Sequence, residues 1–206
     1  MTYLGKGGRI PYLCKEDIAK ESENLLEECW DGSFPVDVEA ICDDLNIGIM
    51  PTAGLSKNVG VDAFISTDFK TIYVDSVEYD KASYRYRFSI AHELGHFVLH
   101  KKYCSSSASD FNEWLKILHS VKNNYAEFQA NYFAGSLLVP ENELVKFLND
   151  EFDGSFARNY WHAGSAELGK ILAETRRHFC ASDIVIARRM RDAFPGVEEE
   201  ANVFKK

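Results

Sequence analysis

Long apolar runs are missing from the sequence. No stretch approaches the ~20 consecutive apolar residues that a membrane-spanning helix needs, and the most apolar segment, residues 133–139, is interrupted by Gly135 and Ser136. Residues 1–14 carry charges and glycines without an apolar segment, which is unlike a secretory signal. We therefore expect a protein that does not enter or cross a membrane.

Paired cysteines are also lacking. The five cysteines are an odd number, their spacing is irregular, and no two of them form a CxxC pair. Such a set suits neither a disulfide framework nor a cysteine-rich zinc module, and it is typical of a reducing compartment. This composition predicts a cytoplasmic protein.

Positive charge is in the minority. The chain has 23 lysines and arginines against 32 aspartates and glutamates, which gives a net charge of −9. This balance excludes binding of nucleic acid or anionic membrane over the whole surface, although it leaves room for a local basic patch. Hydrophobic residues make up 46% and charged residues 27%, which excludes a disordered, collagen-like or coiled-coil chain. We expect one domain over residues 1–206, with a core over about 15–140 and a helical C-terminal extension over about 141–194.

The first third of the sequence predicts two short helices followed by a small sheet. Apolar spacing predicts helices over residues 16–29 and 36–45. Three short segments rich in β-branched and aromatic residues then predict strands. The predicted strands cover residues 47–50, 61–66 and 71–74. Because residues 66–70, between the last two strands, look like a hairpin turn, we expect a mostly antiparallel three-stranded sheet.

Helical periodicity dominates the rest of the chain. The predicted helices cover residues 82–101, 111–121, 125–139, 141–149, 166–177 and 182–193. The order of helices, small sheet and further helices predicts the α+β class, with a helix-rich domain and a helical C-terminal part.

One motif in the predicted helix over residues 82–101 is typical of metal chemistry. Residues 92–96 read HELGH, an HExxH motif. Positions four apart on a helix differ by only about 40° around its axis, so His92 and His96 face the same side and can bind one Zn²⁺. Glu93 can reach a water on the open side of the metal, take its proton and deliver it to a leaving amine. The alternative is a helix with two hydrogen-bonded histidines and a surface glutamate.

A catalytic zinc ion normally has three protein ligands and one open position, so a third ligand is needed. His100 is nearest in sequence, but ligands at 92, 96 and 100 on a straight helix would span about 12 Å, too far for bonds of about 2 Å to one ion. We therefore expect His100 to support or pack against the site. The metzincin class is excluded, because Lys102 stands where its third histidine would lie.

Glu127, on the predicted helix over residues 125–139, is the better candidate for the third ligand. The same helix face carries Ala130, Asn131 and Ala134. The small residues would let this helix press closely against the histidine helix and bring the carboxylate to the metal. Asn131 could accept the remaining N–H of a ligand imidazole. The alternative for Glu127 is an ordinary solvated glutamate.

At these residues the chain resembles the ImmA/IrrE family of zinc-dependent metallopeptidases. The matching stretches are RFSIAHELGHFVLH over residues 87–100, EFQANYFA over 127–134 and LLVP over 137–140. The family pairs a HELGH helix that ends in Leu-His with a helix that carries Glu, Ala, Asp or Asn, and Phe-Ala. This pair is more specific than HExxH alone, and the resemblance covers about residues 15–140.

The resemblance implies that His92, His96 and Glu127 bind zinc and that Glu93 is the general base and acid, in a gluzincin-like arrangement. Another divalent ion such as Mn²⁺ could take the place of zinc. The resemblance further implies cleavage of a helix-turn-helix repressor, which derepresses mobile-element or stress-response genes. We expect the repressor to act as a partner in trans and an extended substrate strand to bind the sheet edge near residues 61–66.

The two C-terminal helices could imitate a helix-turn-helix, because arginines cluster on them. The arginines are Arg176, Arg177, Arg188, Arg189 and Arg191. The net negative charge of the chain favours instead two amphipathic helices with solvated arginines that cover the core or dock a partner, so we expect no direct binding of nucleic acid.

Two further points stay open on the sequence. The rival to the peptidase hypothesis is a metal-stabilised interaction module, or toxin-like partner, that binds a regulator without cleaving it. His119 and several tyrosines are candidates for stabilising the oxyanion, and nothing in their spacing selects one.

Overall fold

The computed structural model describes residues 10–77, 84–103, 125–152 and 165–194. The helices are α1 (Lys15–Cys29), α2 (Val38–Asp44), α3 (Leu55–Val59), α5 (Tyr84–His100), the 3₁₀ turn η1 (Lys101–Tyr103), α7 (Tyr125–Leu138), α8 (Glu141–Glu151), α10 (Ser165–Phe179) and α11 (Asp183–Ala193). The strands are β1 (Gly48–Thr52), β2 (Ala63–Ile65) and β3 (Thr71–Asp75). The α+β class predicted from the sequence is confirmed. The helix predicted over residues 111–121, which includes His119, lies outside the described residues.

The three strands form a mixed sheet in the order β1-β3-β2. β2 and β3 are antiparallel and are joined by the predicted hairpin, in which the Ser66 amide donates to the Thr71 carbonyl at 2.7 Å. β1 runs parallel to β3, with Gly48 opposite Thr71. The sequence predicts a mostly antiparallel sheet, whereas one of the two strand pairs in the structure is parallel. The reason is that the chain passes from β1 through α3 to the far edge of the sheet, where β2 lies, before β3 returns to the centre. β2 is therefore an edge strand.

Helix α3 was not expected from the sequence. It is only five residues long, and Gly54 and Gly60 enclose it with φ of 74° and 77°. Its first turn is fixed from a distance, because the Ser56 amide donates to Asp75 at the end of β3 at 2.8 Å. Such a tertiary cap leaves no periodic signal in residues 55–59.

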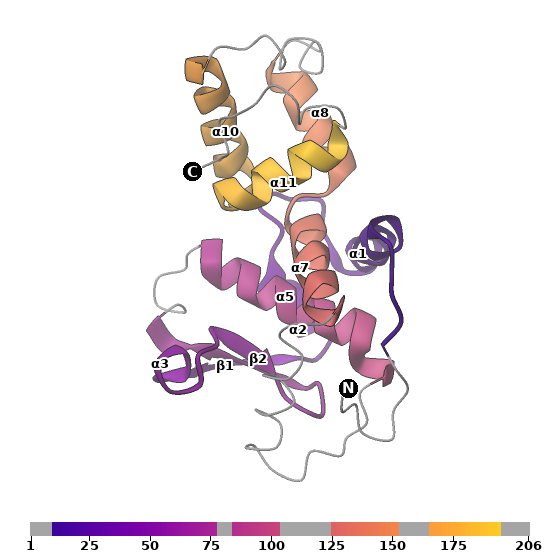
Figure 1. Cartoon of the computed structure of the whole chain (residues 1–206), viewed down its shortest axis with the longest axis vertical. Helices are drawn as coiled ribbons and strands as arrows, with labels where there is room; N and C mark the ends of the chain where they lie inside the picture. Colours follow the sequence, from indigo (N-terminus) through magenta and orange to yellow (C-terminus); the bar gives the residue numbers. More distant parts are fainter. Residues whose placement is uncertain (1–9, 78–83, 104–124, 153–164, 195–206) are drawn as a thin grey trace.

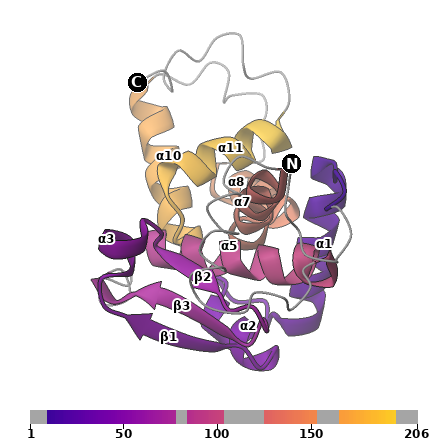
Figure 2. The same ribbon diagram turned by 60° about the horizontal axis from the view of Figure 1, so that its bottom comes forward.

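Helix α5 lies between the sheet and α7. Figures 1 and 2 show α5 crossing one face of the sheet, with α7 on its opposite side, and α5 contacts β2, β3 and α7. Burial from two directions explains the wide apolar stripe on this helix, where Ile90, Ala91 and Leu94 are fully buried. The HELGH motif is thus carried by a central helix of the described chain.

Two further helices pack against α7. Helix α1 packs along α7, and α11 packs against both α7 and α8 (Figure 1). The buried side chains Ile186 and Met190 face this core from α11. This packing agrees with the expected amphipathic pair that covers the core. The expectation that its arginines are solvated is wrong for Arg189, which is buried because it donates to the Val139 carbonyl and pairs with Glu141 and Asp192. Among the described helices, none combines the length and the apolar character that a membrane crossing requires.

Candidate metal centre

A glycine allows α5 and α7 to approach closely at the HELGH motif. A Cβ atom at Gly95 would lie 3.0 Å from the Cα and 3.2 Å from the carbonyl oxygen of Ala130, and 3.2 Å from a ring carbon of Phe133. The obstacle is partly backbone, so it cannot turn aside as a flexible side chain would. The contact therefore fixes the separation between the two helices and the side chains that they carry.

This approach brings three metal-binding side chains together. Nε2 of His92 lies 3.0 Å from Nε2 of His96, and the two oxygens of Glu127 each lie 3.4 Å from one of these nitrogens. Donors bonded at about 2.1 Å to one tetrahedral ion are about 3.4 Å apart. The set of two imidazoles and one carboxylate also matches the ligands of catalytic zinc sites. The residues present therefore fit a zinc ion.

An amide holds the first histidine in the orientation that this site needs. Oδ1 of Asn131 lies 3.2 Å from Nδ1 of His92. An amide oxygen only accepts hydrogen bonds, so the network assigns the proton to Nδ1 of His92. The lone pair is then on Nε2, the nitrogen that faces His96 and Glu127.

A chain of three hydrogen bonds orients the second histidine. The Gln129 amide nitrogen donates to the carbonyl of Pro11 at 2.9 Å, which turns its oxygen toward Nε2 of His100, also at 2.9 Å. Burial lowers the pKa of His100 to about 4, so its imidazole is neutral and its Nδ1 accepts from Nδ1 of His96 at 2.9 Å. His96 consequently presents the Nε2 lone pair to the centre of the triad.

The charges of the triad are adjusted by burial and by mutual contact. Burial raises the pKa of the Glu127 carboxyl, but protonated imidazoles at His92 and His96 would donate hydrogen bonds to it and outweigh this effect, so its pKa lies well below the usual range. Burial lowers the pKa of His92, but the hydrogen bond that its protonated ring would donate to Glu127 and the charges of Glu93 and Glu127 outweigh this effect and raise it. Glu127 is thus an ionised carboxylate at neutral pH, as a metal ligand must be.

Glu93 lies beside the triad and is tied to the sheet. Its side chain is only 5% exposed, and one carboxylate oxygen accepts the backbone N–H of Ile65 at 2.8 Å. This bond joins the helix that carries HELGH to the edge strand β2. It leaves the second oxygen available to the cavity that Glu93 shares with the triad.

The cavity in front of the triad has a volume of about 250 Å³ and opens along the sheet edge. His92, Glu93, His96 and Glu127 line one side of it, and residues 60–63 line the other. One strand end is held there by a two-pronged ion pair, in which Arg85 donates to Asp62 at 2.8 and 2.6 Å. A carbonyl placed in this space would lie among the triad, the Glu93 carboxylate and the edge of the sheet.

The comparison with known protein families finds a match that includes the triad. A model described as the IrrE N-terminal-like domain, Peptidase_M78, matches residues 42–179. The chain belongs to this family. The match runs from α2 to the end of α10 and includes the sheet and both helices of the triad, so the resemblance read from the sequence is confirmed. A search of curated proteins finds no match.

The matching model is that of a peptidase family, Peptidase_M78, and membership in it supports the conclusion that this protein is a metallopeptidase. The structure brings together the residues that the sequence nominated as metal ligands, as general base and as their support: His92, Glu93, His96, Glu127 and Asn131. His119, a candidate for stabilising the oxyanion, lies outside the described residues. His100 lies behind His96 and outside the triad. Sequence reasoning missed Gln129 and the Ile65 amide, because both act across 28 residues or more and neither belongs to a local pattern.

Proposed function

We propose that this protein is a zinc-dependent endopeptidase that cleaves a helix-turn-helix transcriptional repressor at a specific site. The observation that carries the peptidase proposal is the His92, His96 and Glu127 triad, which shares one open cavity with the carboxylate of Glu93. Family membership supports the same chemistry. The repressor as substrate follows from the resemblance to ImmA/IrrE proteins, and a cytoplasmic location suits both this substrate and the unpaired cysteines.

The division of labour follows from the geometry. His92, His96 and Glu127 would hold the ion, which would act as a Lewis acid toward the scissile carbonyl and the attacking water. Glu93 is placed to take a proton from the attacking water and to deliver it to the nitrogen of the leaving amine. The Ile65 N–H holds one oxygen of Glu93 in place. The side chain is therefore kept in one rotamer, with its other oxygen available to the cavity.

The edge of the sheet offers a place for an extended substrate. Asp62 and Ser66 direct their backbone groups to β3, since the Asp75 amide donates to Asp62 and the Ser66 amide to Thr71. By alternation along the strand, Ala63 directs its N–H and C=O away from β3, toward the cavity that it lines. A peptide added here as a further strand would be held by its main chain, which suits cleavage inside a chain rather than at its end.

The test takes its candidate substrates from the helix-turn-helix repressors encoded in the same genome, and the one that binds this protein is used as the repressor. The zinc-loaded protein is incubated with the repressor, and fragments are followed on a gel with and without a chelator. Glu93→Gln should retain zinc, fold and repressor binding while cleavage falls by about 10²–10⁴-fold, the usual contribution of a positioned general base. Glu151→Gln, an exposed change at the end of α8, is the control and should cleave like the wild type.

Two results would overturn this proposal. Equal cleavage by Glu93→Gln and the wild type would remove the assigned role of Glu93 in the mechanism. If the zinc-loaded wild type binds the repressor and never cuts it, the endopeptidase proposal is wrong. The protein would then be an interaction module that recognises a regulator through the same site.

A further inference from the structure

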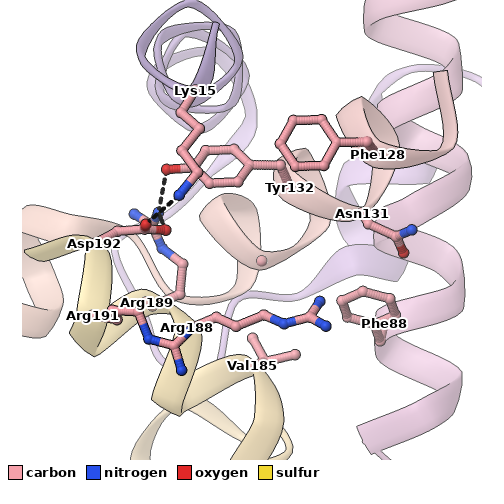
Figure 3. Close-up of a pocket in the computed structure, with 11 residues that line it drawn as sticks. Lys15, Phe88, Phe128, Asn131, Tyr132, Val185, Arg188, Arg189, Arg191 and Asp192 are labelled. Atoms are coloured by element: carbon pink, nitrogen blue, oxygen red, sulfur yellow. Dashed lines mark hydrogen bonds and ion pairs between the residues drawn. The ribbon is translucent and has the colours of Figure 1, made fainter. Parts of the chain in front are cut away.

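A second cavity, of about 340 Å³, lies beside the metal centre between α7 and α11. Its apolar walls are the rings of Phe88, Phe128 and Tyr132 and the side chain of Val185. Figure 3 shows the Arg188 side chain extending from α11 across this cavity toward Phe88 and away from the helix that carries it. The cavity therefore combines aromatic walls with a cation that points inward.

Positive charge dominates the lining. Among the described residues that line the cavity, four are cations, Lys15, Arg188, Arg189 and Arg191, and one is a carboxylate, Asp192. This local excess stands out in a chain whose net charge is −9. A ligand for this cavity is therefore expected to carry negative charge.

Two of these cations are already neutralised by protein groups. Lys15 forms an ion pair with Asp192 at 2.7 Å (Figure 3). Arg189 is 3% exposed, donates to the carbonyl of Val139 at 3.0 Å and pairs with Glu141 and Asp192 at 3.6 Å. Because these bonds hold the Lys15 and Arg189 side chains in place, the two residues form part of the cavity wall and are not available to bind a ligand.

Arg188 differs from Lys15 and Arg189 in its lack of a partner among the described residues. It is exposed, and within the described parts of the chain its guanidinium has no hydrogen-bond or ion-pair partner. One unpaired guanidinium suits one carboxylate, to which it can donate two parallel hydrogen bonds. The rings beside it suit the methylene groups of the same side chain.

The cavity borders the metal centre through two residues. Phe88 lines both this cavity and the cavity of the triad. Asn131 lines the second cavity and contacts the ring of His92. A peptide bound across the triad would therefore place the side chain of a residue close to the scissile bond in this second cavity.

We propose that the cavity between α7 and α11 binds the carboxylate side chain of a substrate residue near the scissile bond, and that Arg188 selects an aspartate or glutamate there. The proposal rests on the proposed endopeptidase function and adds to it a specificity for acidic side chains.

The first test measures cleavage of quenched fluorescent peptides by the zinc-loaded protein, with each position varied in turn. At one position, the wild type should cleave the glutamate peptide with a kcat/KM about tenfold above that of its glutamine counterpart. Arg188→Gln should bring this ratio close to one, and Arg188→Glu should shift the preference to lysine or arginine. Arg177→Gln, which removes an exposed arginine of α10 outside the cavity, should keep the wild-type ratio.

The second test does not depend on cleavage. Protein labelled with ¹⁵N at the arginine side chains is titrated with N-acetyl-glutamate methylamide and with its glutamine counterpart. The signal of Arg188, assigned by its loss in Arg188→Gln, should shift with the first compound only.

The outcomes separate the two proposals. A wild type that cleaves peptides without preferring an acidic residue, or an Arg188→Gln variant that keeps the preference, overturns the acidic specificity and leaves the endopeptidase intact. If no peptide is cleaved, the endopeptidase proposal fails and the titration decides: an unmoved Arg188 signal overturns the carboxylate site, and a shift specific to the glutamate compound supports it.

Discussion

A single methyl group at Gly95 should disturb the metal centre without touching any of its ligands. In Gly95→Ala the new Cβ would meet the backbone of Ala130 at 3.0 and 3.2 Å and the ring of Phe133 at 3.2 Å. Real Cβ atoms rarely come this close, so α5 and α7 must separate by a few tenths of an ångström. His92 and His96 move with α5 and Glu127 with α7, so the triad opens.

Two effects oppose each other in the stability of this variant. Overpacking a buried contact costs about 1–3 kcal/mol, and replacing glycine by alanine inside a helix recovers about 1 kcal/mol. The free energy of unfolding without metal should therefore fall by about 0–2 kcal/mol. Zinc affinity should respond more strongly, because metal–ligand distances tolerate only about 0.2 Å, and we expect a loss of about tenfold or more.

The matched control is Gly169→Ala on α10, where a Cβ meets nothing within 4 Å. This variant should gain up to about 1 kcal/mol and keep its zinc affinity. Urea unfolding in the presence of a chelator and competition with a zinc-binding dye measure the two quantities. If Gly95→Ala is stabilised as much as Gly169→Ala and binds zinc as the wild type does, the close-approach argument is refuted.

Three further predictions concern the groups around the site and the core. Ile65→Pro removes the N–H that holds Glu93 and should lower kcat about tenfold with zinc content unchanged, whereas Ile65→Ala keeps the N–H and should keep kcat; equal values would contradict the positioning role. Gln129→Leu should weaken zinc binding about 10–100-fold in dye competition, because the hydrogen-bond chain to His96 loses its acceptor, and Gln129→Glu should restore most of it. Burial, with nearby carboxylates, raises the pKa of the Cys42 thiol from 9.0 to about 12, so the folded state keeps a proton that the unfolded chain releases. The thiol should therefore make the free energy of unfolding fall by about 1.4 kcal/mol per pH unit above pH 9, and Cys42→Ala should lack this part of the slope in urea titrations.

The helices of the site could be predicted because their evidence is local. The spacing of His92 and His96 fixes a common helix face, and the small residues around Glu127 predict a close helix partner. The parallel pairing of β1 with β3 and the short helix α3 could not be predicted, since each depends on how distant segments meet. A strand pattern identifies a strand and leaves its neighbours open.

The different roles of the arginines on α11 could likewise not be predicted from the sequence. On the sequence Arg188 and Arg189 are adjacent members of one basic cluster. In the structure Arg189 is buried and paired, whereas Arg188 lines the cavity between α7 and α11 without a partner among the described residues. Composition gave the charge of the segment, and only the packing of α11 on α7 separates the structural arginine from the available one.

The central claim is that His92, His96 and Glu127 bind one zinc ion in front of Glu93. The most direct measurement is anomalous X-ray diffraction at the zinc edge from crystals of the zinc-loaded protein. The account predicts one peak per chain, bonded to Nε2 of both histidines and to the Glu127 carboxylate at about 2.0–2.2 Å. No peak between these three side chains, or an ion that is bound through His100 in place of Glu127, would contradict it.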